Sequence, residues 1–298
     1  MRIIIDFDGT LTAEETQAET LRHKSLRTLA DEIIGVPYAQ LERDYLVTQR
    51  KLLDAPHLYW WAVNGLIASY CDEGAFILNT TTLQTMLNGN PDYVRAIERT
   101  FSNAEYDPAM DCINHLFHRH TAEIPPAFRP GARDALNVLI AHPDRTPMIL
   151  TNSLGDKVRR QIDTLNLDGV IDILGDTRQY AMAPDWPHHF VHPELGEIQR
   201  WAVTPERQID LRRPIYYKAL CGEQNRDPQL AVVADTFSLP GALPLLMGIP
   251  FFLLRTPYTP EWCIQAVKTH RLGYALDEIA ALPEMLNTLA QSSYFNNI

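Results

Sequence analysis

The stretch Ile3-Ile4-Ile5-Asp6-Phe7-Asp8-Gly9-Thr10 near the start of the chain decides the fold. Its three β-branched residues form a short apolar run, which is typical of a strand buried on both faces of a parallel sheet. The polar residues after the run then lie at the carboxyl end of the strand, where ligands bind in open α/β sheets. The sequence therefore predicts a parallel α/β core with a polar site that begins at Asp6.

Composition and charge narrow the class of protein. The chain has 298 residues, of which 46% are hydrophobic, so it can build the core of one large or two moderate domains. A net charge of −11 argues against a nucleic-acid binder. A small phosphorylated partner is still compatible with this charge, because local charges and a metal override the global sign.

The apolar runs, the first residues and the cysteines indicate the cellular location of the protein. Apolar runs stay short of the roughly 20 residues that a membrane-spanning helix needs. The first carboxylate follows Met1 too closely for a cleavable signal to precede it. The four cysteines are widely spaced without a CxxC pair, which favours free thiols. We expect a cytoplasmic protein that contacts no membrane.

Further apolar runs predict a Rossmann-like parallel sheet flanked by helices, in the α/β class. Strands are expected at 148–150, 170–174, 230–234 and 250–254, and helices at 132–140, 155–165, 214–221 and 276–289. Residues 176–212 are irregular, and their alternating part predicts a β-hairpin formed by 197–203 and 208–211.

The stretch from 13 to 125 has a different pattern. Apolar residues recur at helical spacing, helices are expected at 91–101 and 111–120, and the aromatic patch at 59–70 is also interpreted as helical. Pro125-Pro126 and Pro130-Gly131 mark the return to the sheet. We therefore expect a mainly helical domain, 13–125, inserted into a core formed by 1–12 and 126–298.

The two carboxylates of the opening stretch suggest a metal site. Asp6 and Asp8 lie two residues apart on an extended segment, so both side chains point to the same side. Adjacent carboxylates repel each other unless a cation or a shared proton relieves them. Mg²⁺ is the hard cation that proteins use most often near phosphates.

The run from Ile3 to Thr12 resembles the first motif of the haloacid dehalogenase (HAD) superfamily. The resemblance implies that Asp6 attacks phosphorus and forms an aspartyl-phosphate, while Asp8 protonates the leaving group and later activates water. It also implies Mg²⁺ as the cofactor and a helical cap, 13–125, that closes over the site.

The strand ending before Thr151 matches the family pattern for phosphate binding. Thr151 takes the place of the Ser or Thr that hydrogen-bonds the transferring phosphoryl group, and the backbone N–H groups of Asn152 and Ser153 add contacts. We expect Gly9 and Thr10, which follow the two acids, to contact the same phosphate.

Asp235 ends the strand at 230–234 and matches the family's metal-binding acid. The implied metal site comprises the carboxylates of Asp6 and Asp235 and the backbone carbonyl of Asp8, with waters and phosphate completing the shell. The family usually has a second acid soon after Asp235, but Thr236 and Leu239 stand in those places. This departure removes one ligand or one outer partner of the metal.

The family also has a basic residue before this strand, which stabilises charge on the phosphoryl oxygens. Arg213 stands beside Pro214, as the family residue often does, whereas Lys218 has the usual side chain one turn later. We favour Lys218 on its chemistry and leave Arg213 open.

Other polar and aromatic clusters are weaker candidates. Basic residues of 13–125 are candidate substrate contacts, although most are expected on solvated helix faces: Arg22, His23, Lys24, Arg27, Arg50 and Lys51. Tyr59-Trp60-Trp61 is expected to pack inside the cap rather than to stack on a base. A second cluster has residue types that suit zinc, but its irregular, Pro-rich setting favours an incidental grouping: Asp185, His188, His189 and His192.

These observations predict a magnesium-dependent phosphatase, a hydrolase that acts on the phosphoric monoester of a small metabolite. Two alternatives stay open. A phosphotransferase or mutase of the same family would use the same residues, and a phosphate-ligand binding or regulatory protein would have weak or no turnover. The missing acid after Asp235 motivates the second alternative.

Overall fold

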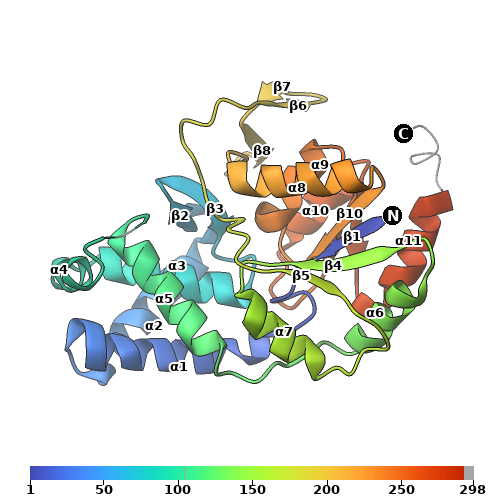
Figure 1. The fold of residues 1–298 in the computed structure, drawn as a ribbon. Helices are drawn as coiled ribbons and strands as arrows, with labels where there is room; N and C mark the ends of the chain where they lie inside the picture. The colour runs from blue at the N-terminus through green and yellow to red at the C-terminus, as the bar shows by residue number, and fades with distance from the viewer. Residues whose placement is uncertain (104, 292–298) are drawn as a thin grey trace.

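The computed structural model describes residues 1–103 and 105–291. Parallel strands form its main sheet: β1 (Arg2–Ile5), β4 (Thr146–Leu150), β5 (Asp172–Leu174), β10 (Leu230–Ala234), β11 (Phe251–Leu254) and β12 (Gly273–Leu276). Their order across the sheet is β12-β11-β10-β1-β4-β5. The predicted α/β class with a Rossmann-like core is confirmed, and β1 lies between β10 and β4 (Figure 1).

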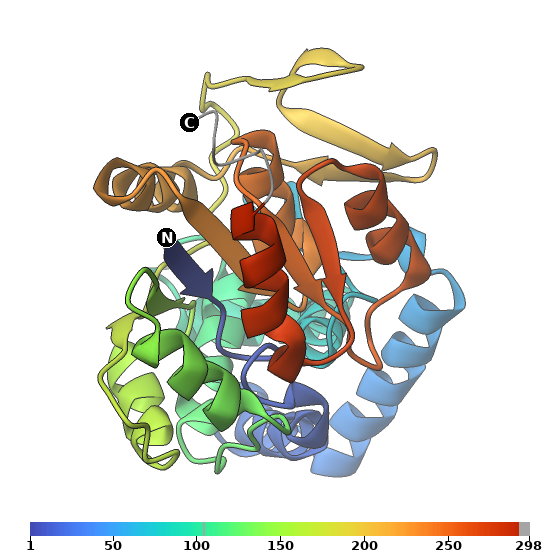
Figure 2. The ribbon, with the colours of Figure 1, turned by 90° about the vertical axis from the view of Figure 1, so that its right-hand side faces the viewer.

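Alternate residues of the strands face two separate apolar layers. Ile4 belongs to the layer under α8 (Pro214–Arg226), α9 (Ala242–Leu246) and α10 (Glu261–Thr269). Ile3 and Ile5 belong to the layer under α6 (Ala132–Ala141), α7 (Gly155–Asp163) and α11 (Leu282–Gln291) (Figure 2). All three isoleucines are essentially inaccessible to solvent, as expected for a strand covered on both faces.

The inserted segment, residues 13–125, is mainly helical and has an apolar core of its own. Its helices are α1 (Ala18–Thr28), α2 (Tyr38–Asp54), α3 (Ala75–Asn88), α4 (Pro91–Thr100) and α5 (Pro108–Thr121). The described chain also contains short helical turns: η1 (Glu14–Thr16), η2 (Leu29–Ile34), η3 (Pro56–Leu58), η4 (Phe237–Gly241) and η5 (Ile279–Ala281). The helices predicted at 91–101 and 111–120 correspond to α4 and α5.

The prediction of a helix over 59–70 is wrong. This stretch is a β-hairpin of β2 (Trp60–Val63) and β3 (Leu66–Tyr70). Asn64 and Gly65 connect the two strands with φ angles of 51° and 74°. Asn-Gly is the sequence that two-residue hairpin turns favour, because both central residues need positive φ. The turn signal therefore outweighs the apparent helical spacing of the aromatic residues.

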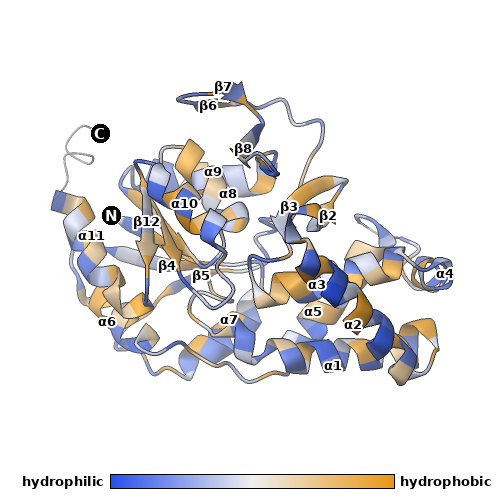
Figure 3. Ribbon diagram, turned by 180° about the vertical axis from the view of Figure 1, so that it is seen from behind, coloured by the Kyte–Doolittle hydropathy of each residue, from blue (hydrophilic) through white to orange (hydrophobic). Residues whose placement is uncertain are grey.

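The stretch from 176 to 212 contains two small hairpins. One pairs β6 (Phe190–His192) with β7 (Gly196–Ile198), and the other pairs β8 (Arg200–Thr204) with β9 (Arg207–Asp210). The predicted hairpin corresponds to β8 and β9, but 197–198 belong to the other one. The hairpin of β6 and β7 mixes hydrophobic and hydrophilic residues, whereas the central strands of the main sheet are mostly hydrophobic (Figure 3).

The chain leaves the core and returns to it at neighbouring points. Thr12 and Phe128 form an isolated antiparallel bridge, and the N–H of Ala13 donates to the carbonyl of Ala127 (2.6 Å). The two ends of the segment 13–125 thus lie side by side, and its division from 1–12 and 126–298 as a separate domain stays a prediction.

Arg213 joins the inserted segment to the core. Its side chain is 1% exposed and donates to the backbone carbonyls of Ala68 (2.6 Å), Gln179 (3.2 Å) and Ser238 (3.3 Å). Burial lowers the pKa of Arg213 to about 10, so the guanidinium is still charged at neutral pH. Three chain segments that are distant in sequence therefore depend on one buried donor.

We expect Arg213→Met to reduce the free energy of unfolding by about 2–4 kcal/mol, because three buried carbonyls lose their donor. Lys218→Met is the matched control, since Lys218 is an exposed residue of the same helix, α8, and should change stability by less than about 0.5 kcal/mol. Urea unfolding of both variants measures the difference. Equal losses would contradict the role given to Arg213.

Candidate active site

Two acids meet at the carboxyl edge of the sheet. Asp6 follows β1 and Asp235 follows β10, and these strands pair in parallel with Ile5 opposite Val233. The N–H of Asp6 still donates to the carbonyl of Val233 (2.9 Å), which extends the pairing to the first acid. The register of the two neighbouring strands therefore brings both carboxylates to the same edge of the sheet, side by side.

Gly9 lets the Asp235 carboxylate approach the turn after β1. It has a φ of +81°, and a Cβ built at this position would overlap the carboxylate of Asp235. The hydroxyl of Thr10 donates to Asp235 Oδ1 (3.0 Å) and accepts from the Asp235 N–H (3.0 Å). Only glycine meets both the conformational and the steric requirement. In this geometry, Gly9 and Thr10 position Asp235; their predicted contact with phosphate stays a prediction.

Asp8 is held on the other side, towards α7. The hydroxyl of Ser153 donates to Asp8 Oδ2 (2.5 Å), and Lys157 Nζ donates to Asp8 Oδ1 (3.1 Å). Lys157 also donates to the hydroxyl of Ser153 (2.9 Å). These contacts fix the orientation of the Asp8 carboxylate.

Thr151 is buried at the end of β4, where the sequence predicted it. Its hydroxyl oxygen accepts from the N–H of Ser153 (3.1 Å), and the side-chain oxygen of Asn152 accepts from the N–H of Gln179 (2.7 Å). Thr151 and Asn152 both line the cavity described below. The N–H of Ser153 already has an acceptor, so its predicted phosphate contact requires that hydrogen bond to change.

The structure brings neither predicted cation to the acids. Lys218 is exposed on α8, and Arg213 is occupied by three backbone carbonyls. Lys157 is the lysine at the site, and it was missed in the sequence. The available signal was its place four residues after Ser153, one turn into α7, because helical side chains point back towards the helix N-terminus.

Glu14 is a further acid that the sequence analysis missed. It comes from η1, is 7% exposed and accepts from the N–H of Phe76 (3.0 Å). Burial raises the pKa of Glu14 well above its ordinary value, and the charge of Asp235 raises it further. Glu14 lines the same cavity as Asp6 and Asp235. An acid from the inserted segment therefore lies near the place where Thr236 and Leu239 replace the expected one.

Burial and mutual repulsion dominate the electrostatics of the acids. Burial raises the pKa of Asp6 well above its ordinary value, and the charges of Asp235 and Asp8 raise it further. Burial raises the pKa of Asp235 to about 7, whereas the charge of Arg129 lowers it. Within the described residues, no basic side chain forms an ion pair with Asp6, in contrast to Asp8 with Lys157.

A cavity of about 110 Å³ opens above these acids. Its floor consists of acids and polar strand ends, and its walls come from β2, α3, α5 and the segments around 180 and 239. Trp61 of β2 is a wall residue and packs against Tyr180 with a centroid distance of 5.3 Å. The expectation that this aromatic group packs inside the inserted segment thus holds only in part.

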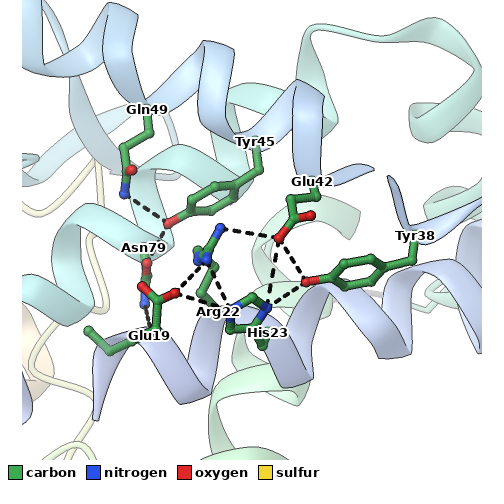
Figure 4. A network of polar contacts seen from close by, with 9 residues as sticks. Glu19, Arg22, His23, Tyr38, Glu42, Tyr45, Gln49 and Asn79 are labelled. Atoms are coloured by element: carbon green, nitrogen blue, oxygen red, sulfur yellow. Dashed lines mark hydrogen bonds and ion pairs between the residues drawn. The ribbon is translucent and has the colours of Figure 1, made fainter. Parts of the chain in front are cut away.

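The basic residues proposed as substrate contacts do not line this cavity. Arg22 and His23 lie in a polar network between α1 and α2, where both contact Glu19 at 2.7 Å and 3.0 Å, respectively (Figure 4). His23 also contacts the hydroxyl of Tyr38 (2.5 Å). Lys24 donates to Glu123 (2.7 Å). These side chains stabilise the inserted segment.

Side-chain metal clusters are absent from the described residues. No group of three or more His, Cys, Asp or Glu side chains there is arranged to hold a metal ion. His188 instead stacks on Trp186 with a centroid distance of 5.1 Å, in line with the expectation of an incidental histidine cluster. The metal site predicted at Asp6, Asp8 and Asp235 stays a prediction.

No helix within residues 1–103 or 105–291 is long and apolar enough to cross a membrane. All four cysteines are free.

No known family model matches the chain, and no curated protein matches it in sequence. Solved structures do resemble it. A predicted phosphoglycolate phosphatase from Haemophilus somnus 129PT is 16% identical with a TM-score of 0.47, and the alignment covers 95% of this chain and 96% of that one. A predicted phosphatase from Clostridium acetobutylicum is 12% identical with a TM-score of 0.47, over 96% and 98% of the chains.

A haloacid dehalogenase-like family hydrolase from Xanthomonas campestris is 11% identical with a TM-score of 0.45, over 97% and 91% of the chains. The likeness is one of architecture, and the chemistry of the site rests on its own residues.

The raised pKa of Asp235 predicts a pH dependence of stability in metal-free protein. An unfolded chain ionises Asp235 near its ordinary pKa, but the folded protein keeps it protonated to about pH 7. The unfolded state therefore binds fewer protons between about pH 4 and 7, and stability must fall as pH rises through this range.

Asp235→Asn should remove this contribution to the pH dependence of the unfolding free energy, which is on the order of a few kcal/mol. Urea unfolding in the presence of EDTA measures it. Asp277→Asn is the control, because Asp277 is highly exposed. An unchanged pH slope in Asp235→Asn would contradict the assignment.

Proposed function

We propose that the chain is a HAD-superfamily phosphatase, a magnesium-dependent hydrolase of phosphoric monoesters that works through an aspartyl-phosphate on Asp6. The observation that carries the proposal is the different environment of the two opening acids. Ser153 and Lys157 hold Asp8, whereas Asp6 has no basic partner within the described residues and faces the cavity. This difference supports Asp6 as the nucleophile and Asp8 as the acid beside it.

The donor set at the strand ends suits Mg²⁺. Asp6 and Asp235 supply carboxylate oxygens and Asp8 a backbone carbonyl, and hard oxygen ligands of this kind favour Mg²⁺ over softer metals. Two buried carboxylates with raised pKa values favour a cation between them. When bound, Mg²⁺ neutralises these acids and withdraws charge from the phosphoryl oxygens.

The residues of this chain divide the reaction into two displacements. A carboxylate oxygen of Asp6 forms a bond to phosphorus as the bond to the leaving oxygen breaks, and the carboxyl of Asp8 gives that oxygen its proton. Asp8 then takes a proton from water, whose oxygen attacks the same phosphorus. The bond to Asp6 breaks, and inorganic phosphate leaves.

Thr151 and Lys157 support both displacements. The Thr151 hydroxyl, buried at the cavity floor, is placed to hydrogen-bond a phosphoryl oxygen. Lys157 carries the positive charge nearest to Asp8 and takes the role that the resemblance gives to Lys218 or Arg213. Such preorganised charges act most strongly where charge develops in the transition state.

Turnover of phosphate esters with and without Mg²⁺ tests the proposal. EDTA and Asp6→Asn should each abolish hydrolysis, because one removes the charge at the strand ends and the other removes the nucleophile. Asp8→Asn should reduce kcat/KM for alkyl phosphates by about 10²–10⁴, and less for aryl phosphates, whose leaving groups need less help from an acid.

Folded wild-type protein that hydrolyses no ester of a broad panel with Mg²⁺ would falsify the proposal and favour a binding or regulatory role. Equal losses on alkyl and aryl esters in Asp8→Asn would contradict only the role of Asp8. Release of the phosphoryl group to an added alcohol rather than water would indicate a phosphotransferase.

Lys157→Met should lower kcat/KM by about 10²–10³, because a preorganised charge is lost from the transition state. Lys218→Met is the control and should keep the wild-type rate, since its side chain is exposed away from the cavity. A wild-type rate in Lys157→Met together with a reduced rate in Lys218→Met would identify Lys218 as the functional cation.

A further inference from the structure

The walls of the cavity differ sharply from its floor. Above the acids, β2, α3, α5 and η4 present apolar side chains: Trp61, Phe76, Ile77, Ile113, Phe117 and Leu239. Their neighbours Thr80 and Asn114 are polar but uncharged. No Lys or Arg lines the cavity among the residues that the structure describes. The part of the substrate beyond the reacting phosphate therefore meets an apolar surface.

The acids of the cavity floor disfavour a second anionic group on the substrate. Asp6, Asp8, Glu14 and Asp235 all line it, and the proposed metal and the reacting phosphate are matched to these acids. A second phosphate or a carboxylate on the substrate would enter a cavity that has no cation to receive it. Burying an unpaired charge is unfavourable, and nearby like charges increase the cost.

His118 does not supply the missing positive charge. Burial lowers its pKa below the ordinary value, and the opposing charge of Asp176 does not reverse this direction. The ring is therefore neutral at pH 7 and offers one donor and one acceptor. Together with Asn114, it offers neutral hydrogen-bonding groups, but no positive charge, to the part of the substrate beyond the reacting phosphate.

We propose that the substrate is a monoester of an uncharged, largely apolar alkyl or aryl alcohol, with one phosphate and no second anionic group. This inference rests on the proposed function. It excludes bisphosphates, phosphoglycerate-like acids and hydroxyl-rich sugar phosphates as preferred substrates.

Arg22 defines the competing possibility. It lines a smaller cavity of about 10 Å³ that shares Thr80, Ile113 and Phe117 with the main one. Its Nε and Nη1 atoms have no hydrogen-bond partner, but the third nitrogen donates to Glu19 (2.7 Å). An anion would reach Arg22 only if these wall residues moved.

Matched ester pairs test the proposal with wild-type protein and Mg²⁺. Butyl phosphate is compared with 4-phosphonooxybutanoate, and 2-phenylethyl phosphate with glucose 6-phosphate; all four release primary alkoxides. We expect kcat/KM to favour the apolar member of each pair by about tenfold or more. Equal rates, or a preference for the charged or hydroxylated member, overturn the inference.

An activated aryl phosphate distinguishes failure of the proposed function from failure of this inference about the substrate. If it and every other ester are left intact, the proposed function is overturned, and this inference with it. If esters are hydrolysed with the opposite preference, only the inference is overturned.

Variants of the wall test the cause of the preference. Thr80→Lys places a cation in the wall and should raise the rate ratio of 4-phosphonooxybutanoate to butyl phosphate by about tenfold or more, whereas Thr80→Val, of similar size, should leave it unchanged. Arg22→Gln should also leave this ratio unchanged. If the rate ratio of 4-phosphonooxybutanoate to butyl phosphate is unchanged in Thr80→Lys but falls in Arg22→Gln, Arg22 is an anion site and the inference is overturned.

Discussion

The contact between the Asp235 carboxylate and the backbone of Gly9 is the constraint on which the site depends. A side chain at Gly9 would occupy the position of that carboxylate, and the positive φ of the residue turns the chain there. Thr10 binds both the side chain and the N–H of Asp235, and Arg129 donates to the Gly9 carbonyl (2.7 Å). The turn after β1, the end of β10 and the returning chain are therefore fixed together.

This convergence gives the two opening acids separate environments. Asp6 continues the line of β1 and remains beside Asp235, where repulsion between buried carboxylates favours a cation. Asp8 lies beyond the start of the turn and is bound by Ser153, which follows β4, and by Lys157 of α7. A single change of chain direction at Gly9 thus separates the proposed nucleophile from the proposed acid, and apolar side chains of the inserted segment line the cavity above both.

Local signals explain what the sequence predicted. The apolar run before Asp6 and the run before Asp235 are short, strongly patterned and buried on both faces, so strand positions and site acids follow directly from them. The hairpin at 60–70 was also predictable, since Asn64-Gly65 is a local signal that the aromatic spacing obscured. The edge strand β12 has no β-branched residue and only weak burial, which is why its pattern is faint.

Tertiary placement explains the rest. Lys157 reaches Asp8 only because α7 starts at the end of β4, and Glu14 reaches the acids only because the chain turns at η1 before entering α1. Arg213 looked catalytic in the sequence, but its three carbonyl partners come from segments far away along the chain. The partners of Arg213 have no signature in residue spacing, whereas the place of Lys157 four residues after Ser153 is a weak one.

Detection of a phosphoryl group on Asp6 is the most direct measurement of nucleophilic attack by this residue. Asp8→Asn is mixed with an aryl phosphate and Mg²⁺, because this leaving group departs without an acid while the slowed base lets the intermediate accumulate. After acid quench and proteolysis, mass spectrometry should find one phosphoryl group on the peptide that contains Asp6, and none in Asp6→Asn. Release of the aryl alcohol with no phosphorylated protein, or phosphorylation of another residue, would contradict the account.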